Sequence, residues 1–202
     1  MAHQRWNFRC YYLFVAGFLA LLSGCAAGSI ASTALELVGI RQPPELPEAQ
    51  QPPRKVDIRL HASSSLNTDA TGHSLALVAR IYKLRQNAAF QQMPYESFLN
   101  AHTERDALGS DLLEVKEVLL VPGQHFEVQE KVPREAAFIG VVALFRAPAQ
   151  QRWRLSFVAS DAEKSGITVG AHACALSIGS GANPDGANPP ALNQPLSNLH
   201  CL

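Results

Sequence analysis

The sequence lacks an excess of charge of either sign. Its 17 basic and 17 acidic side chains cancel, and they form no block of like charge. Proteins that bind nucleic acid through its phosphates carry a basic face, so we expect no nucleic-acid partner. Apolar residues make up 47% of the 202-residue chain, enough for a sizeable hydrophobic core. The composition therefore indicates a globular protein.

The sequence also lacks the patterns by which common enzymes are recognised. It has no G-x-S-x-G turn, no H-E-x-x-H helix, no phosphate-binding loop and no dinucleotide-binding glycine pattern. The remaining candidate groups have no partner at catalytic or ligand spacing. They are Ser63, Ser64, Ser65, His61, His73, His125, Asp106, Asp111 and Glu114. We therefore expect no enzyme, no cofactor, no metal site and no small-molecule substrate. In the pair Trp153-Arg154, strand alternation predicts a buried tryptophan and an exposed arginine.

The N-terminal apolar run is too short to span a bilayer. Residues 11–22 follow Arg5 and Arg9 and would form ~18 Å of helix, against a hydrocarbon core of ~30 Å. These are the proportions of a signal peptide. The run leads into L-S-G-C, which resembles a bacterial lipobox with Cys25 as the lipidated residue. We therefore expect residues 1–24 to be a lipoprotein signal peptide.

Residues 25–54 combine the lipidated Cys25 with a proline-rich tether. The prolines are Pro43, Pro44, Pro47, Pro52 and Pro53. Prolines at this density favour extended backbone, so the segment could reach ~90 Å and hold a folded domain off a membrane. Alanines, and no aspartate, follow Cys25, which by resemblance to the sorting rules of Gram-negative lipoproteins implies the periplasmic face of the outer membrane.

Two cysteines lie beyond the signal peptide and the lipidation site. Cys174 and Cys201 form an even pair in an oxidising compartment, so we expect a disulfide between them. The alternative is a metal site, because His172 and His200 stand beside these cysteines. The H-x-C and H-C spacings do not match the usual zinc knuckle, which favours the disulfide.

The middle of the chain alternates apolar and polar residues, which is typical of half-buried strands. We predict strands over residues 55–62, 75–84, 113–121, 126–132, 136–146, 151–160 and 166–178. A short helix is expected at 95–99, after Pro94. Seven short strands separated by turn signals indicate an all-β fold, an antiparallel two-sheet β-sandwich over residues 55–178. Residues 179–202, rich in proline and glycine, should form an irregular tail.

The ordered set of these features resembles the TssJ family, the outer-membrane lipoproteins of type VI secretion systems. Besides the lipobox and tether, the resemblance is carried by the loop at 66–74, by V-A-R-I-Y-K-L at 78–84 and by A-F-I-G-V-V-A-L-F-R at 137–146. It covers residues 56–158 in order. Two features depart from the family pattern: Thr68 stands where proline is common, and the tail after residue 178 is additional.

The resemblance implies a transthyretin-like β-sandwich that binds the periplasmic C-terminal region of the inner-membrane protein TssM, within a complex that also contains TssL. The family's contact with TssM is the loop between the first two strands. That loop maps to residues 63–74 and places the contact on Leu66, Asn67, Thr68, Asp69, Ala70, Thr71 and Gly72. Within it we expect Leu66 to be the apolar anchor, with Asn67 and Asp69 as orienting hydrogen-bond groups. The alternative function is a periplasmic ligand-binding lipoprotein, which would show as an apolar pocket with convergent polar groups.

Overall fold

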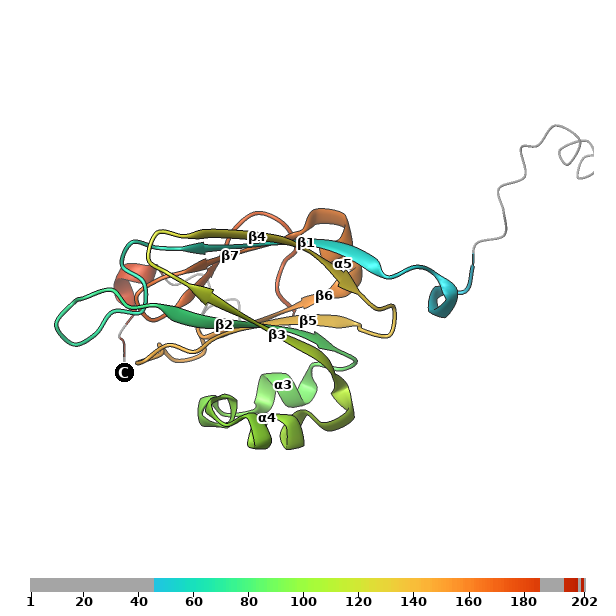
Figure 1. Cartoon of the computed structure of the whole chain (residues 1–202), viewed down its shortest axis with the longest axis horizontal. Helices are drawn as coiled ribbons and strands as arrows, with labels where there is room; N and C mark the ends of the chain where they lie inside the picture. The colour runs from blue at the N-terminus through green and yellow to red at the C-terminus, as the bar shows by residue number, and fades with distance from the viewer. Residues whose placement is uncertain (1–45, 186–194, 200, 202) are drawn as a thin grey trace, which may run out of the picture. The chain divides into compact units, whose positions relative to one another are not determined.

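The computed structural model describes residues 46–185, 195–199 and 201. The predicted signal peptide, Cys25 and most of the predicted tether lie outside these residues. Pro47–Leu202 form one compact unit, and only this unit is described below. It consists of two stacked four-stranded sheets with short helices at one outer face (Figure 1).

Sheet A has the strand order β4-β1-β7-β8, and sheet B has the order β3-β2-β5-β6. The strands of sheet A are β1 (Arg54–Ala62), β4 (His125–Val132), β7 (Ile167–Ala171) and β8 (Leu176–Ile178). Those of sheet B are β2 (Leu77–Leu84), β3 (Leu112–Leu120), β5 (Phe138–Ala143) and β6 (Arg154–Val158). The predicted two-sheet β-sandwich is confirmed.

Two details of the predicted sheets were wrong. The β1–β7 pair is parallel, whereas every other strand pair described is antiparallel. The strand predicted at 166–178 is two strands, because residues 172–175 turn the chain back so that β8 pairs antiparallel with β7. Cys174 therefore lies in a turn and not in a strand.

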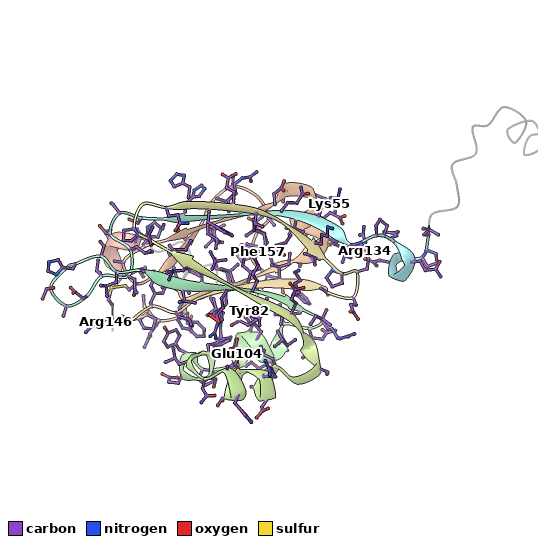
Figure 2. The ribbon with its side chains drawn as sticks, in the orientation of Figure 1. Lys55, Tyr82, Glu104, Arg134, Arg146 and Phe157 are labelled. Atoms are coloured by element: carbon purple, nitrogen blue, oxygen red, sulfur yellow. A yellow bond between two sulfur atoms is a disulfide. The ribbon has the colours of Figure 1, made fainter. Side chains whose placement is uncertain are left out.

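The interior is filled by the alternate apolar residues that the sequence pattern singles out. In β1, Val56, Ile58 and Leu60 are buried, while the residues between them face outward. Phe157 of β6 reaches the same core from the opposite sheet (Figure 2). A buried ion pair also crosses the interior: Lys83 Nζ of β2 lies 3.1 Å from a carboxylate oxygen of Glu130 on β4. Lys116 Nζ of β3 lies 2.6 Å from the other carboxylate oxygen of Glu130, so the sheets are joined by apolar packing and by one carboxylate paired with two lysines.

The outer face of sheet B is partly covered by a helical excursion between β2 and β3. It comprises α3 (Ala88–Gln92), η2 (Tyr95–Leu99), α4 (Ala101–Leu108) and η3 (Gly109–Asp111). The Phe90 ring lies so close to Gly140 that a Cβ on the glycine would come within 2.6 Å of it. The predicted helix at 95–99 is therefore a 3₁₀ turn within a larger helical layer.

The helix α4 is attached to sheet B through a buried polar cluster. The Tyr82 hydroxyl donates to one carboxylate oxygen of Glu104, and the Arg80 guanidinium donates to the other at 2.6 Å (Figure 2). Burial, together with the hydrogen bond to Glu104, raises the pKa of Tyr82, so its hydroxyl stays protonated and remains a donor. The only buried residues of α4 are Glu104 and Leu108, which explains why apolar periodicity did not reveal this helix.

The strand predicted at 151–160 is shorter than expected. It ends at Val158, and the helix α5 (Ala159–Ser165) follows, burying Ala159 and Ala162. Trp153 is buried as predicted, but the prediction of an exposed Arg154 is wrong. Its guanidinium donates to the main-chain oxygens of Phe90 and Met93, which pins the start of the helical layer to β6.

Candidate functional site

The loop predicted to bind a partner lies at one end of the sandwich, and residues 47–53, the last part of the predicted tether, enter at the other (Figure 1). Residues 63–76 form this loop, which joins β1 to β2. Residues 47–53 precede β1 at its opposite end. Because β1 has nine residues at ~3.3 Å each, the two points are separated by ~30 Å of sheet.

The base of the loop is built into the core. Leu66 has no exposed surface, and its carbonyl accepts a hydrogen bond from the Leu75 amide at 3.0 Å. The prediction that Leu66 anchors a partner is wrong, because a fully buried side chain offers no contact area. Leu66 stands alone among polar residues, so the sequence has no repeating apolar pattern there from which its burial could be inferred. Leu66 instead holds the base of the loop on the sandwich.

Asn67 fixes the path of the chain beside Leu66. Its backbone has a φ of 45°, in the left-handed region that asparagine tolerates better than most residues. Its side-chain nitrogen donates to the carbonyl of Ala76 at 2.8 Å, and its side-chain oxygen accepts from the Arg146 amide at 2.8 Å. One buried amide thereby closes the loop and joins it to the β5–β6 connection.

The tip of the loop is organised around the Asp69 carboxylate. One of its oxygens accepts from the Thr71 amide at 2.8 Å, the Thr71 hydroxyl at 2.7 Å and the His73 amide at 2.9 Å. The hydrogen bond from the Thr71 side chain and those from the backbone lower the pKa of Asp69 to about 2. Gly72 completes the turn at a φ of 85°. The tip is thus a preformed polar surface.

The residues that a partner could reach lie at this tip. Ala70, Thr71, Gly72 and His73 are exposed, and Thr68 and Asp69 are partly exposed. Of the seven residues predicted as the contact, the structure brings the last five together at the surface and places Leu66 and Asn67 beneath them.

Apolar side chains that the sequence reading had not assigned to the site are exposed on β3 and its neighbours. They are Leu75, Leu99, Val115, Leu119 and Val121, with Leu119 the most exposed at 61%. Leu75 belongs to the loop itself, and Val115 and Leu119 alternate with the buried Val118 and Leu120. The sequence did indicate these exposed side chains, because residues 113–121 have apolar residues at both odd and even positions. A strand with this pattern presents apolar side chains on both of its faces.

The tether end is held by charged side chains. The Arg54 guanidinium is buried, donates to the carbonyl oxygens of Arg134 and Ala136, and pairs with Glu48 and with Glu163 at 3.5 Å. Arg134 in turn donates to the Pro52 carbonyl at 2.8 Å. Residues 48–52 of the predicted tether are therefore attached to the sandwich.

Cys174 and Cys201 form a disulfide, as predicted. His172 donates or accepts a hydrogen bond with Ser177 at 2.7 Å, and His200 lies outside the described residues. Across the residues that the structure describes, no three His, Cys, Asp or Glu side chains are grouped to hold a metal ion. No helix in that same part of the chain is long and apolar enough to cross a membrane.

Other polar candidates are paired locally. Asp106 lies 2.7 Å from His102 one helical turn away, and Glu114 pairs with Lys83 at 2.9 Å. The rings of His61 and His125 stack with their centres 4.6 Å apart. These contacts pair the candidate groups with neighbouring side chains and do not assemble a nucleophile with a base.

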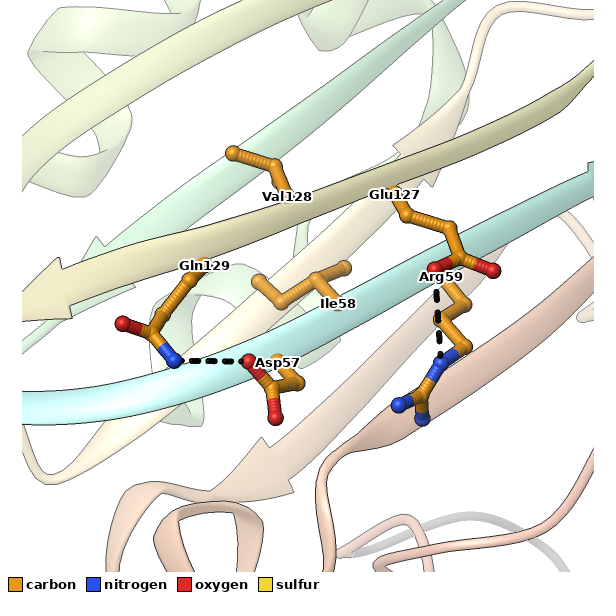
Figure 3. Close-up of a pocket in the computed structure, with 6 residues that line it drawn as sticks. All are labelled: Asp57, Ile58, Arg59, Glu127, Val128 and Gln129. Atoms are coloured by element: carbon orange, nitrogen blue, oxygen red, sulfur yellow. Dashed lines mark hydrogen bonds and ion pairs between the residues drawn. The ribbon is translucent and has the colours of Figure 1, made fainter.

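Two depressions on the surface are candidate ligand sites. A shallow one of about 250 Å³ lies on β1 and β4, where Asp57 pairs with Gln129 and Arg59 with Glu127, so its polar groups bind one another (Figure 3). An open groove of about 580 Å³ lies near the loop, and its walls include Tyr95, Leu99, Arg146 and Trp153. The Tyr95 hydroxyl donates to the carbonyl of Phe145, so it does not point to a ligand.

Comparison with known proteins identifies close structural relatives. A chain of the crystal structure of the T6SS lipoprotein TssJ1 from Pseudomonas aeruginosa is 29% identical, with a TM-score of 0.57, over 66% of this chain and 99% of that one. A chain of a structure described as a type VI membrane complex is 26% identical (TM-score 0.57), over 62% of this chain and 97% of that one. A chain of the structure described as the T6SS protein TssM C-terminal domain from EAEC is 25% identical (TM-score 0.53), with the same coverage.

No curated protein sequence matches the chain. Residues 54–174 match the family described as Type VI secretion lipoprotein, VasD, EvfM, TssJ. The match begins at the first residue of β1 and ends at the disulfide-bonded Cys174, so it spans the sandwich up to the β7–β8 turn. The chain therefore belongs to the TssJ family of type VI secretion lipoproteins.

Proposed function

We propose that this chain is the outer-membrane lipoprotein of a type VI secretion membrane complex and that it binds the periplasmic C-terminal region of TssM, in a complex with TssL. Residues 1–24 would be the signal peptide, Cys25 the lipidated residue and residues 25–54 the tether. The contact is the tip of the β1–β2 loop, residues 68–73. The protein acts as a structural connector and not as an enzyme.

The observation that carries this proposal is the placement of tether and loop at opposite ends of β1. A lipid anchor at one end directs the other end away from the membrane that holds it. The loop is then presented to a partner that rises from the inner membrane. The relatives found in structures of the type VI membrane complex and of the TssM C-terminal domain support the choice of partner.

The chemistry of the tip also supports a protein partner. The Asp69 turn is preformed, so little conformational entropy is lost when a partner binds it. Leu75, in the same loop, and Val121, next to the β3–β4 turn that bonds to Ser63, are exposed apolar side chains. A polar, ordered loop beside exposed apolar residues is the usual composition of a protein-binding surface.

The test is calorimetric titration of the TssM periplasmic region into the lipidated chain held in detergent. Ala70→Arg adds a long charged side chain to the exposed tip, and Ala107→Arg makes the same change on the exposed face of α4. Disrupting a residue at the centre of an interface costs ~2 kcal/mol or more of binding free energy, so we expect the tip variant to bind at least ~30-fold more weakly. The α4 variant should bind as the unmodified chain does, and both should melt at the same temperature.

Equal affinity in the two variants would move the contact away from the loop. Absence of binding by the unmodified chain would overturn the proposed partner and favour the alternative of a periplasmic ligand-binding lipoprotein.

A further inference from the structure

The C-terminal segment beyond the family match is fastened along the open side of the sandwich. After β8, the Gly179 amide donates to Thr168 at 2.8 Å and the Ala182 amide donates to Gly166 at 2.8 Å. The Asp185 amide then donates to Ser156 on β6 at 2.6 Å. The segment thus passes from the edge of sheet A to the edge of sheet B.

Asp185 forms the first attachment point of this segment. Its carboxylate accepts from the Asn87 side chain at 2.7 Å, and its carbonyl accepts from the Gln91 side chain at 3.1 Å. Both donors belong to the start of the helical layer. This attachment lies at β6 and α3. Of the hydrogen bonds described for Asp185, none goes to the β1–β2 loop.

The disulfide forms the second attachment point. Cys201 is bonded to Cys174 in the β7–β8 turn, and Leu199 packs against Ala149, Cys174 and Ala175. The Cys174 carbonyl also accepts from the Ala149 amide at 2.9 Å. The end of the chain, the β7–β8 turn and the β5–β6 connection are therefore joined at one place.

The β1–β2 loop rests on this same turn. The Asn67 amide donates to the carbonyl of His172 at 3.0 Å, and the Thr68 amide donates to the carbonyl of Ala173 at 3.0 Å. These two acceptors immediately precede Cys174. The side chain of Asn67 also accepts from the Arg146 amide, in the connection that the disulfide-bonded turn contacts through Ala149.

We propose that the Cys174–Cys201 disulfide positions the partner-binding loop by holding the β7–β8 turn on which the loop rests. This inference rests on the proposed function for its effect on TssM binding, but its structural part stands on the contacts alone. No contact is described between the disulfide and residues 69–73 at the tip. The disulfide restrains the carbonyl groups of residues 172 and 173, which accept hydrogen bonds from the amides of residues 67 and 68. These two hydrogen bonds fix the position and direction from which the Asp69 turn projects.

The test compares hydrogen–deuterium exchange in the unmodified lipoprotein and in the Cys174→Ala/Cys201→Ala variant, both in detergent. We expect the Asn67 and Thr68 amides of the variant to exchange at least tenfold faster, with amides in the middle of β1 unchanged. Binding of the TssM periplasmic region should weaken at least tenfold. Asp185→Ala is the matched control, since it removes the side-chain hydrogen bond from Asn87 at the first attachment point and should leave the exchange of Asn67 and Thr68 unchanged.

Unchanged exchange at Asn67 and Thr68 in the double variant would overturn the inference. So would equal acceleration of these amides and of β1, or equal acceleration by Asp185→Ala, because the effect would then be general destabilisation. If the unmodified chain fails to bind TssM, the proposed function falls, while the exchange measurement still decides whether the disulfide holds the loop.

Discussion

The two ends of the sandwich are held by different kinds of interaction. At the tether end, the buried Arg54 guanidinium gathers carboxylates and carbonyl oxygens around one charge. At the loop end, the neutral side-chain amide of Asn67, backbone hydrogen bonds and a disulfide set the conformation of an exposed surface. The comparison teaches that the two ends are stabilised separately, so the end proposed for attachment can be disrupted without the end proposed for recognition.

Removal of the lipid should have the largest effect and should be confined to the tether end. Cys25→Ser eliminates the acylation site, and stable anchoring needs more than one apolar chain at ~0.8 kcal/mol per buried CH₂. We expect complete loss from the membrane fraction, with TssM binding unchanged. Membrane fractionation after a high-salt wash checks the first outcome, and a variant that stays bound would refute lipidation at Cys25.

Arg54→Ala should have the next largest effect, on stability. It leaves the carbonyls of Arg134 and Ala136 without their donor and Glu163 with one cation fewer. Loss of a buried charged donor of this kind costs ~2–3 kcal/mol in the free energy of unfolding. Urea unfolding measures it. Lys55→Ala, at the exposed neighbouring position, should change stability by less than ~0.5 kcal/mol, and a similar value for both variants would contradict the role given to Arg54.

Asn67→Ala should have a moderate effect at the loop end. It removes the hydrogen bonds to Ala76 and Arg146 and places alanine at positive φ, for a cost of ~2 kcal/mol. Asn67→Gly loses the same hydrogen bonds but adopts this φ without strain, so it should cost ~1 kcal/mol. Chemical denaturation of the pair separates the two contributions. If the alanine variant proves no less stable than the glycine variant, backbone strain at this position is unimportant.

The smallest effect concerns the ionisation of Asp69. Because its pKa is lowered to about 2 in the folded protein, from an ordinary value of 3.8, its carboxylate stabilises the tip above pH 3.8. That contribution is lost as the pH falls through about 2. We expect the amide resonances of Thr71 and His73 in NMR spectra to shift with a midpoint near 2. A midpoint near the ordinary value would show that the hydrogen bonds at the tip do not form in solution.

The strands and the disulfide could be predicted from the sequence because their signals are local. Val56, Ile58 and Leu60 alternate with polar residues, and Cys174 and Cys201 are the even pair left once the predicted signal peptide and the predicted lipidation site are set aside. The parallel pairing of β1 with β7 could not be predicted, since strand direction depends on the path of the whole chain.

The loop was predicted in position but not in structure. Residues 68–72 stand at the surface, whereas the burial of Leu66 depends on the return of the chain through Leu75, which no short-range pattern encodes. The helix α5 was missed for a related reason. Its buried face consists of Ala159 and Ala162, and two small residues give too weak a period to distinguish a helix from an extended strand.

The course of β1 has a mechanical consequence. Any tension between a membrane anchor and a partner bound at the β1–β2 loop would be directed along this strand. β1 is bonded on both sides, to β4 and to β7, and interstrand hydrogen bonds lie across the direction of such a pull. The force would therefore pass along the extended covalent backbone of β1, and the hydrogen bonds to β4 and β7 would not have to carry it. A pull that peeled β1 from β4 would break them one after another.

We expect single-molecule pulling between residues 50 and 70 to lengthen the molecule little, because it loads the already extended backbone of β1. Pulling between residues 50 and 131 should instead unzip β1 from β4, because Lys131 pairs with Lys55 at the end of β1 nearest residue 50. Equal extension in the two experiments would contradict this consequence of the topology, and with the expected result β1 behaves as a tie between the predicted tether and the proposed recognition loop.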